Sequence, residues 1–449
     1  MGRILRWFRQ NTLRTIAFGF AGIIIAGSLL LTLPVASSNG VSVGLFDALF
    51  TSTSAVCVTG LVVRDTGTEY SRFGHVVIMM LIQTGGLGFM TFATLILRFL
   101  GRRITLRERM VIRESMNEDS MNGLAQLIQW VALSTLFIEL TGAVLLSFRM
   151  IPQFGWGDGI FYSVFHAVSA FCNAGFDLFG GYSSLTRYYS DVLVNLTIGM
   201  LIVCGGLGFA VIQDLKKKPR LHQLKLHTKI VLVSYGSAFL VGFLFNLLAE
   251  WNNPGTLGPL SVGEKVLAAM FQSVTLRTAG FNTIDQAALN PATKLINSIL
   301  MFIGASPAST GGGIKVTTFA ILILVVRMVV RGESSINVFC RRFDPSMVAR
   351  AVAIIAIAFG IVLVDVATIS LLEPKFHLID ITYECASAMG TVGISSIGSG
   401  NLGVVSRILL ILTMYLGRIG PLTMALLLAQ RQTRDKESIR YPEERIMLG

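Results

Sequence analysis

The segment Ser54-Ala55-Val56-Cys57-Val58-Thr59-Gly60-Leu61 is a short apolar run that ends near a glycine and is too short to cross a membrane. Similar segments recur at residues 169–176 (SAFCNAGF), 273–281 (SVTLRTAGF) and 387–394 (SAMGTVGI). Their last glycines are 115, 105 and 113 residues apart, which is about a quarter of the 449-residue chain. This period indicates four copies of one structural unit.

The composition indicates a membrane protein. Hydrophobic residues make up 53% of the chain, charged residues 14%, and the mean hydropathy is +0.68, whereas soluble domains contain roughly 25% charged residues. The net charge of +12 is explained by basic loops beside a membrane, so no nucleic-acid partner is needed. The cysteines lack metal-ligand spacing. We expect buried thiols, no disulfides, and the lipid bilayer as the surroundings.

Each short segment lies between two longer apolar runs, and about 20 apolar residues suffice to span a bilayer. This predicts an all-α polytopic fold with eight spans and four re-entrant segments. The first run could be a signal peptide, but its length favours a retained helix. The predicted units are an N-terminal segment 1–14, repeats at 15–100, 127–215, 227–330 and 347–429, and a tail at 430–449.

The positions of Lys and Arg predict the topology. Most of the 37 lie before residue 15 or in the connections 98–113, 216–229, 327–350 and 431–445. Positive loops stay on the cytoplasmic side, so both termini are predicted to be cytoplasmic in the cell membrane and the short segments to face outside. The four repeats are then parallel, whereas inverted-repeat symporters alternate in orientation.

The short segments are predicted to be half-helices that surround one central pore. Each begins near an acidic residue, as favoured by the helix dipole: Asp47, Asp158, Glu264 and Asp380. Their C-terminal ends would direct partial negative charge towards the membrane centre, and a ring of backbone carbonyls there would select cations. The alternative for any single glycine is helix packing, but four glycines in register favour a filter.

The second long run of each repeat carries another set of glycines, at 85–89, 205–209, 311–315 and 417–421. In repeat three the run at residues 304–313, which leads into these glycines, is too rich in Gly, Ser and Pro for a continuous helix. We expect a flexible loop that closes the pore; a kinked packing helix is the alternative. The loop residues are Gly304, Ala305, Ser306, Pro307, Ala308, Ser309, Thr310, Gly311, Gly312 and Gly313.

Two arginines have unusual positions in apolar sequence. Arg418 falls at the centre of the last span, where an arginine usually faces a bundle interior or a wet cavity. It is predicted to form an electrostatic barrier or, alternatively, to bind a carbonyl of the broken span. Arg277 occupies the register of Cys57 and Cys172. It is predicted to point behind the filter and pair with Glu384, or else with carbonyls alone.

The segments VCVTGL (56–61), NAGF (173–176), RTAGF (277–281) and TVG (391–393) resemble the filter sequences of the Trk/Ktr/HKT superfamily of potassium transporters, and most of all the Ktr membrane subunit. The resemblance covers essentially the whole chain. It implies an intramembrane gate with Lys315 beside it and Arg418 opposite. It also implies K⁺ coordination by the carbonyls of Val58, Thr59, Gly60, Asn173, Ala174, Gly175, Thr278, Ala279, Gly280, Thr391, Val392 and Gly393.

The resemblance further implies potassium uptake by a homodimer, controlled by a ring of cytoplasmic RCK-type subunits that bind ATP and ADP. Nucleotide would act only through that partner, and Na⁺ could be an activator. The last ten residues resemble a tail at the dimer interface, with a dangling tail as the alternative. No enzyme motif and no metal site beyond K⁺ are expected. Gly60 favours K⁺, since some Na⁺-preferring relatives carry serine there; a sodium-permeable member or a coupled symporter remains open.

Overall fold

The computed structural model describes residues 12–88, 92, 124–217, 220–333, 335–339, 341–343, 346–420 and 423. Within these residues the chain is almost entirely helical, and its strands are β1 (Asn337–Val338) and β2 (Arg341–Arg342), an antiparallel pair. The predicted N-terminal segment up to residue 11, the basic connection 98–113 and the tail 430–449 lie outside the described residues.

The helices follow the predicted order of long, short and long in each repeat. Repeat one contains α2 (Thr12–Thr32), η1 (Pro34–Ala36), α3 (Leu45–Val56), α4 (Thr66–Glu69) and α5 (Arg72–Leu87). Repeat two contains α8 (Leu124–Phe171), η2 (Thr186–Tyr188), α9 (Val192–Leu207) and α10 (Phe209–Lys217), followed by η3 (Leu221–Gln223). Repeat three contains α11 (Leu226–Glu250), α12 (Val262–Thr275), α13 (Pro291–Ile303) and α14 (Val316–Val330). Repeat four contains α15 (Ser346–Leu372), α16 (Leu378–Gly390), η4 (Ser399–Asn401) and α17 (Val404–Ile419).

Helix α8 combines the first long helix and the short helix of repeat two. Its backbone leaves the helical region at Gly155 (φ 78°, ψ 174°), three residues after Pro152. A proline and a glycine this close interrupt the helical hydrogen bonding, so the part after Gly155 corresponds to the separate short helices α3, α12 and α16.

Four described helices are long and apolar enough to cross a membrane: α2, α8, α11 and α15. Helices α9 and α10 form a further candidate, but they bend by 95° at Gly208, where the glycine has φ 90°. The prediction of one continuous span over 192–215 is therefore wrong. The chain has several apolar spans, and the count of eight stays a prediction.

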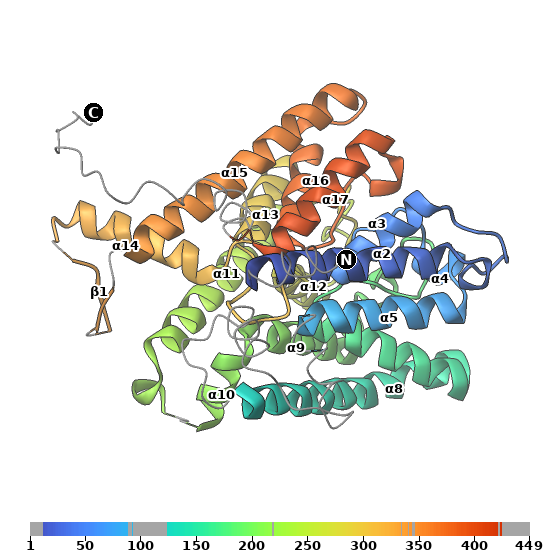
Figure 1. Ribbon diagram of the computed structural model, residues 1–449, viewed down its shortest axis with the longest axis horizontal. Coiled ribbons are helices and arrows are strands. Elements are labelled where there is room, and N and C mark those ends of the chain that lie inside the picture. The colour runs from blue at the N-terminus through green and yellow to red at the C-terminus, as the bar shows by residue number, and fades with distance from the viewer. Residues whose placement is uncertain are drawn as a thin grey trace, which may run out of the picture.

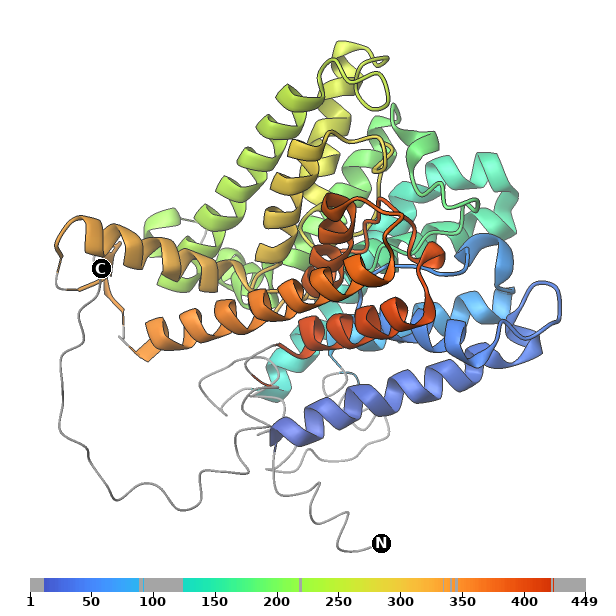
Figure 2. The same ribbon diagram turned by 90° about the horizontal axis from the view of Figure 1, so that it is seen from above.

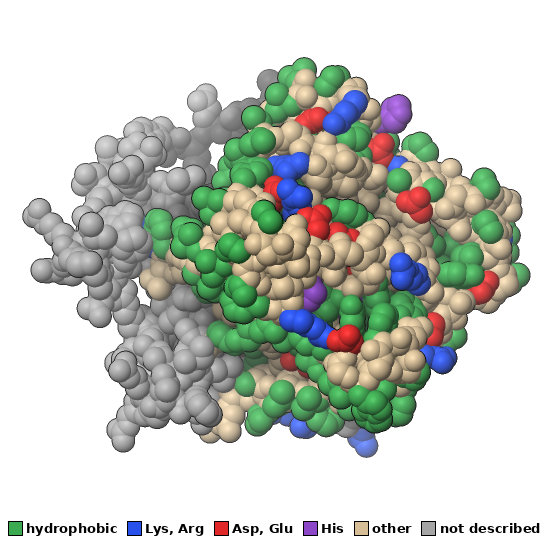
Figure 3. All heavy atoms as spheres, turned by 90° about the vertical axis from the view of Figure 1, so that its right-hand side faces the viewer, with side chains coloured by type: hydrophobic (Ala, Val, Ile, Leu, Met, Phe, Trp, Pro, Cys, Tyr) green, Lys and Arg blue, Asp and Glu red, His purple; other side chains and the backbone are tan. Residues whose placement is uncertain are grey.

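Helices α2, α5 and α8 run along the horizontal axis of Figure 1, whereas α11 and α15 are inclined to it. Figure 2 shows the same helices from above. The connections between repeats, near α10, α14 and β1, gather at the left of Figure 1, and the loops within repeats gather at the right. Seen from that right-hand end, acidic and basic side chains are scattered among apolar ones (Figure 3). On the long helices Phe137, Leu248 and Leu371 are exposed by 71%, 75% and 84%, as expected for lipid-facing side chains.

Three ion pairs connect the N-terminus of a short helix to the second long helix of a neighbouring repeat. The pairs are Arg72 with Asp158, Lys294 with Asp380, with 2.6 Å between nitrogen and oxygen, and Arg407 with Asp47, with 3.2 Å between them. These contacts join repeat one to two, three to four, and four to one. They fix the relative positions of the short helices and hence of the loops that follow them.

Candidate ion-binding site

The four glycine-containing loops form a closed ring. We call residues 58–60, 173–175, 278–280 and 391–393 the glycine loops. A β-carbon added to Gly175 would lie 2.7 Å from the Cα of Gly280, and one added to Gly280 would lie 2.8 Å from the Cα of Gly175 and 2.7 Å from the Val392 oxygen. A β-carbon on Gly393 would lie 2.9 Å from the Cα of Gly60, and one on Gly60 would overlap repeat two. The glycine loops thus meet one another in chain order, and the fourth contacts the first.

Each glycine loop begins with the same unusual backbone conformation. Its first residue is left-handed although it is not glycine, with φ between 51° and 69°: Val58, Asn173, Thr278 and Thr391. The following glycines also have positive φ, from 71° to 94°. A left-handed non-glycine residue costs about 1–2 kcal/mol, and such strain tends to occur where function requires the geometry.

Hydrogen bonds at the ends of the short helices hold this conformation. In repeat one the Thr59 N–H donates to the Ser54 carbonyl at 2.8 Å and the Val58 N–H donates to the Ala55 carbonyl at 3.2 Å. This is the Schellman pattern of helix ends, and repeats two and four repeat it. Side chains add to it, since the Ser54 and Ser387 hydroxyls accept the N–H groups of Gly60 and Gly393 at 3.0 Å.

The backbone carbonyls of the twelve glycine-loop residues accept no hydrogen bond from any described residue. All twelve residues are buried except Gly393, which is half-buried. Buried carbonyls in proteins are nearly always paired. Two side-chain oxygens at the same place, Thr59 Oγ1 and Asn173 Oδ1, are also buried without a described partner. The ring therefore presents oxygen atoms that no described part of the chain satisfies.

The loop at 304–315 between α13 and α14 lies against the glycine loops. The Gly312 N–H donates to Thr391 Oγ1 at 3.0 Å, and a β-carbon on Gly313 would lie 3.1 Å from the Cα of Gly390. The loop also binds two other repeats, because the Thr310 N–H donates to the Gly205 carbonyl at 3.2 Å and the Gly313 N–H donates to the Gly417 carbonyl at 3.1 Å. The predicted break of this span is confirmed.

Arg418 and Lys315 hold the same loop through carbonyl oxygens. The Arg418 guanidinium donates to the carbonyls of Thr310 in the loop and of Gly85 and Gly86 in α5, the last at 3.2 Å. Lys315 Nζ donates to the Gly311 carbonyl at 2.7 Å. Arg418 therefore connects the loop to repeat one. Its bond to the Thr310 carbonyl matches the alternative given for it above, which was binding to a carbonyl of the broken span.

The predicted ion pair between Arg277 and Glu384 is wrong. Arg277 is fully buried and donates to the carbonyls of Leu300 and Ala238 at 3.4 and 3.3 Å. Glu384 instead accepts the hydroxyls of Ser395, at 2.6 Å, and Ser399. The alternative, pairing of Arg277 with carbonyls alone, is the arrangement found among the described residues. Two backbone carbonyl oxygens accept from the Arg277 guanidinium, and among the described residues no carboxylate does so.

The second set of glycines packs against the short helices. Gly85, Gly205 and Gly417 each lie so close to a short-helix carbonyl that a β-carbon would overlap it; the carbonyls belong to Val56, Phe171 and Met389. In repeat three the corresponding glycine, Gly311, is in the predicted loop, beside Thr278. There the helix ends earlier, at Gly304, which has φ 63°.

A cavity of about 450 Å³ opens on one side of the ring, and the four ring glycines contribute to its wall. We call it the vestibule. Its wall includes two carboxylates, Asp65 and Asp177, and no Lys or Arg among the described residues. The vestibule thus lies directly against the ring.

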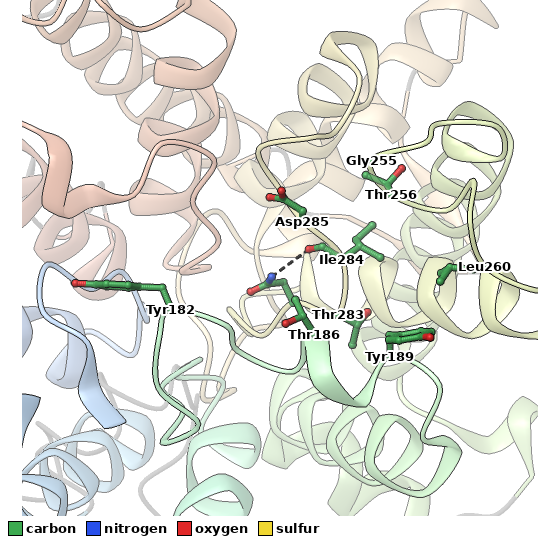
Figure 4. Close-up of a pocket in the computed structure, with 10 residues that line it drawn as sticks. Tyr182, Thr186, Tyr189, Gly255, Thr256, Leu260, Thr283, Ile284 and Asp285 are labelled. Carbon is green, nitrogen blue, oxygen red and sulfur yellow. Dashed lines mark hydrogen bonds between the residues drawn. The ribbon is translucent and has the colours of Figure 1, made fainter. Parts of the chain in front are cut away.

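A second cavity of about 460 Å³ lies beside the vestibule (Figure 4) and shares Tyr182 and Asn282 with it. In Figure 4 Tyr182 lies apart from the other labelled residues, towards repeat one. The dashed line marks the hydrogen bond from Asn282 Nδ2 to the Ile284 carbonyl, 3.1 Å long. This bond steadies the repeat-three loop that follows Gly280.

Comparisons with known proteins place this geometry in a family. The profile of the TrkH family, described as cation transport proteins, matches residues 8–438. The chain belongs to the TrkH family of cation transport proteins. This confirms the resemblance seen in the filter-like segments, and the family is one of transport proteins rather than enzymes.

Several TrkH-family relatives match nearly the whole chain. The Ktr system potassium uptake protein B of Bacillus subtilis (strain 168) is 40% identical over 447 residues, covering 100% of this chain and 99% of that protein. The protein of the same name from Vibrio alginolyticus is 39% identical, covering 97% and 94%. The potassium/sodium uptake protein NtpJ of Enterococcus hirae is 37% identical, covering 98% of each.

The fold is that of a solved TrkH-family structure. The crystal structure of the potassium transporter TrkH from Vibrio parahaemolyticus matches with a TM-score of 0.73 and 20% sequence identity, covering 95% of this chain and 86% of that one. At this identity the likeness establishes the fold alone.

Some residues around the site were missed in the sequence. The basic residues Arg72, Lys294 and Arg407, each of which joins two repeats, were not singled out from the sequence. Their common position, at the start of the second long helix, was the available signal. Asp65 and Asp177 were not singled out either, although Asp177 follows Gly175 by two residues.

Proposed function

We propose that this chain is the ion-conducting subunit of a Ktr-type potassium uptake system in the cell membrane. The observation that carries the proposal is the closed ring of glycine loops, whose twelve carbonyls have no described hydrogen-bond donor. Family membership and the printed names of the relatives, which include potassium uptake proteins, support it.

In this proposal the ring is a selectivity filter. Its carbonyls replace the water around a K⁺ ion, as in other potassium-selective pores. The short helices end at the ring, so their partial negative charge favours a cation there. The Thr59 and Asn173 side-chain oxygens, buried and without described partners, add polar atoms near the ion path.

The loop at residues 304–313, with Lys315 and Arg418, is the proposed gate. It contacts Thr391 of the ring and the second helices of repeats two and four. Arg418 adds a link to repeat one through Gly85. An ion leaving the filter meets this loop and the Arg418 charge, so conduction requires the loop to move and Arg418 to release the Thr310 carbonyl.

The driving force is the electrochemical gradient. A membrane potential contributes about 2.3 kcal/mol per charge per 100 mV, which corresponds to roughly fiftyfold accumulation of K⁺. The proposed topology has eight spans in four parallel repeats, at 15–100, 127–215, 227–330 and 347–429, with both termini cytoplasmic. The positive connections between repeats support this orientation.

The proposed assembly is a homodimer controlled by a separate RCK-type ring that binds ATP and ADP. The word "system" in the relatives' names is consistent with more than one subunit. The exposed residues Lys216, Lys217, Arg220 and Lys225, between repeats two and three, offer a basic docking surface for such a partner. Na⁺ is proposed as an activator, as the family resemblance implies.

Sodium permeation is the second candidate function. One relative at 37% identity is named a potassium/sodium uptake protein. Gly60 supports potassium, since it leaves the first glycine loop without a side chain that would narrow the ring. Ion competition separates the two candidates.

The test is cation flux into liposomes that contain the purified chain, with an inside-negative potential and K⁺ and Na⁺ in competition. We expect K⁺ influx well above Na⁺ influx, and K⁺ influx that Na⁺ does not reduce by competition. Equal flux of the two ions would favour the sodium candidate. No flux of either ion through the folded wild type and through folded Arg418→Gln, which lacks the proposed gate contact, would contradict the proposed function.

A further inference from the structure

The vestibule contains a second ring, directly outside the four glycines. The residues two positions after each ring glycine all contribute to its wall: Val62, Asp177, Asn282 and Ser395. All four residues therefore line one cavity. Only one of these four residues has an ionisable side chain, so the ring has a single fixed carboxylate.

The Asp177 carboxylate is free to bind a cation. One oxygen, Oδ1, accepts the Phe179 N–H at 3.0 Å, and no described residue donates to the other oxygen. Asp65, the other carboxylate of the vestibule, uses both oxygens: Oδ1 accepts the Thr68 N–H at 3.0 Å and Oδ2 accepts the Tyr182 N–H at 2.7 Å. Asp65 therefore joins the outer loops of repeats one and two, whereas Asp177 has an unused acceptor.

We propose that Asp177 is the entry site for the transported cation and sets its apparent affinity. The carboxylate, which is two residues after Gly175 in the chain, attracts a monovalent cation to the mouth of the filter. It holds the cation there while water is removed from the ion. This inference rests on the proposed function. A single charge in a cleft raises the local concentration of a counter-ion and its rate of entry by about tenfold or more at low ionic strength, and added salt screens the effect.

The experiment measures the half-saturating K⁺ concentration and the maximal rate of the full-length chain in liposomes. Asp177→Asn is compared with the wild type at low ionic strength and with added impermeant salt. Asp285→Asn is the control, because Asp285 is exposed and lines the second cavity rather than the vestibule. Asp177→Asn should raise the half-saturating concentration about tenfold with little change in maximal rate, and salt should reduce the difference.

Val62→Asp supplies an independent test, because it adds a carboxylate to another position of the same ring without removing a side-chain hydrogen bond. It should lower the half-saturating concentration in the wild-type background and restore it in the Asp177→Asn background. The inference is overturned if Asp177→Asn conducts with unchanged half-saturation at low ionic strength. It is also overturned if Asp177→Asn is not folded and Val62→Asp leaves the half-saturating concentration unchanged. Absence of K⁺ flux in both the wild type and Arg418→Gln, in the same liposomes, would instead contradict the proposed function.

Discussion

A single methyl group at Gly175 should abolish the discrimination between K⁺ and Na⁺. Gly175 has φ 71°, and a β-carbon there would lie 2.7 Å from the Cα of Gly280 and 2.8 Å from the Ala279 oxygen. Non-bonded carbon atoms prefer about 3.5–4.0 Å, so the backbone of one loop must move by about 0.8 Å. The atoms that move belong to the ring itself, because the neighbours are backbone and not a flexible side chain.

Two costs contribute to the effect of Gly175→Ala, backbone strain and overpacking, and a substitution at a second glycine separates them. Alanine with positive φ costs about 1–2 kcal/mol, and overpacking costs about 1–3 kcal/mol more. Gly181 has φ 65°, but a β-carbon there would have no atom within 4 Å. Gly181→Ala therefore has the backbone strain without the displacement of the ring.

The assay is competition between K⁺ and Na⁺ for flux in liposomes, with each variant first checked for folding by gel filtration. Gly175→Ala should lower the K⁺/Na⁺ ratio at least about tenfold, the equivalent of 1.4 kcal/mol, and Gly181→Ala should leave it unchanged. A selective Gly175→Ala variant would refute the ring geometry. An equal loss in both variants would show that backbone strain, rather than contact between loops, determines the effect.

Two further substitutions test the gate and the connections between repeats. Arg418→Gln removes hydrogen bonds from a charged donor, which are worth about 1.5–3 kcal/mol, and should raise K⁺ flux about tenfold. Arg331→Gln, at an exposed arginine, is the control and should leave the flux unchanged. Unchanged or reduced flux in folded Arg418→Gln protein would contradict the gating role. Lys294→Met leaves Asp380 unpaired at a site where the lysine side chain is 7% exposed, which should lower stability by about 3–5 kcal/mol in thermal unfolding in detergent. Lys375→Met is its control, since that pair is 3.7 Å apart and the lysine is 58% exposed, so the loss should be about 0–1 kcal/mol; equal melting temperatures for the two variants would count against the inter-repeat connection.

The repeats and the glycine loops could be predicted from the sequence because they depend on local patterns. Hydrophobic run length, a recurring glycine and the composition of residues 304–313 are all visible without a structure. The break at Gly208 was missed, because a single glycine is compatible with a helix and only its φ of 90° shows that the chain turns there.

Contacts between distant residues could not be predicted in the same way. Arg407 and Asp47 are 360 residues apart in the chain, and no sequence pattern marks them as a pair. The prediction for Arg277 failed for a related reason, since its partners are the carbonyls of Leu300 and Ala238. Every residue has a carbonyl, so the sequence gives no sign of which one is used.

The measurement that tests the central claim most directly is a crystal structure of the protein with Rb⁺ in place of K⁺, in which anomalous scattering locates the ions. We expect Rb⁺ on the axis of the ring, coordinated by carbonyls of residues 58–60, 173–175, 278–280 and 391–393, and displaced by K⁺ in preference to Na⁺. A ring without Rb⁺, while the ion binds elsewhere in the chain, would contradict the account.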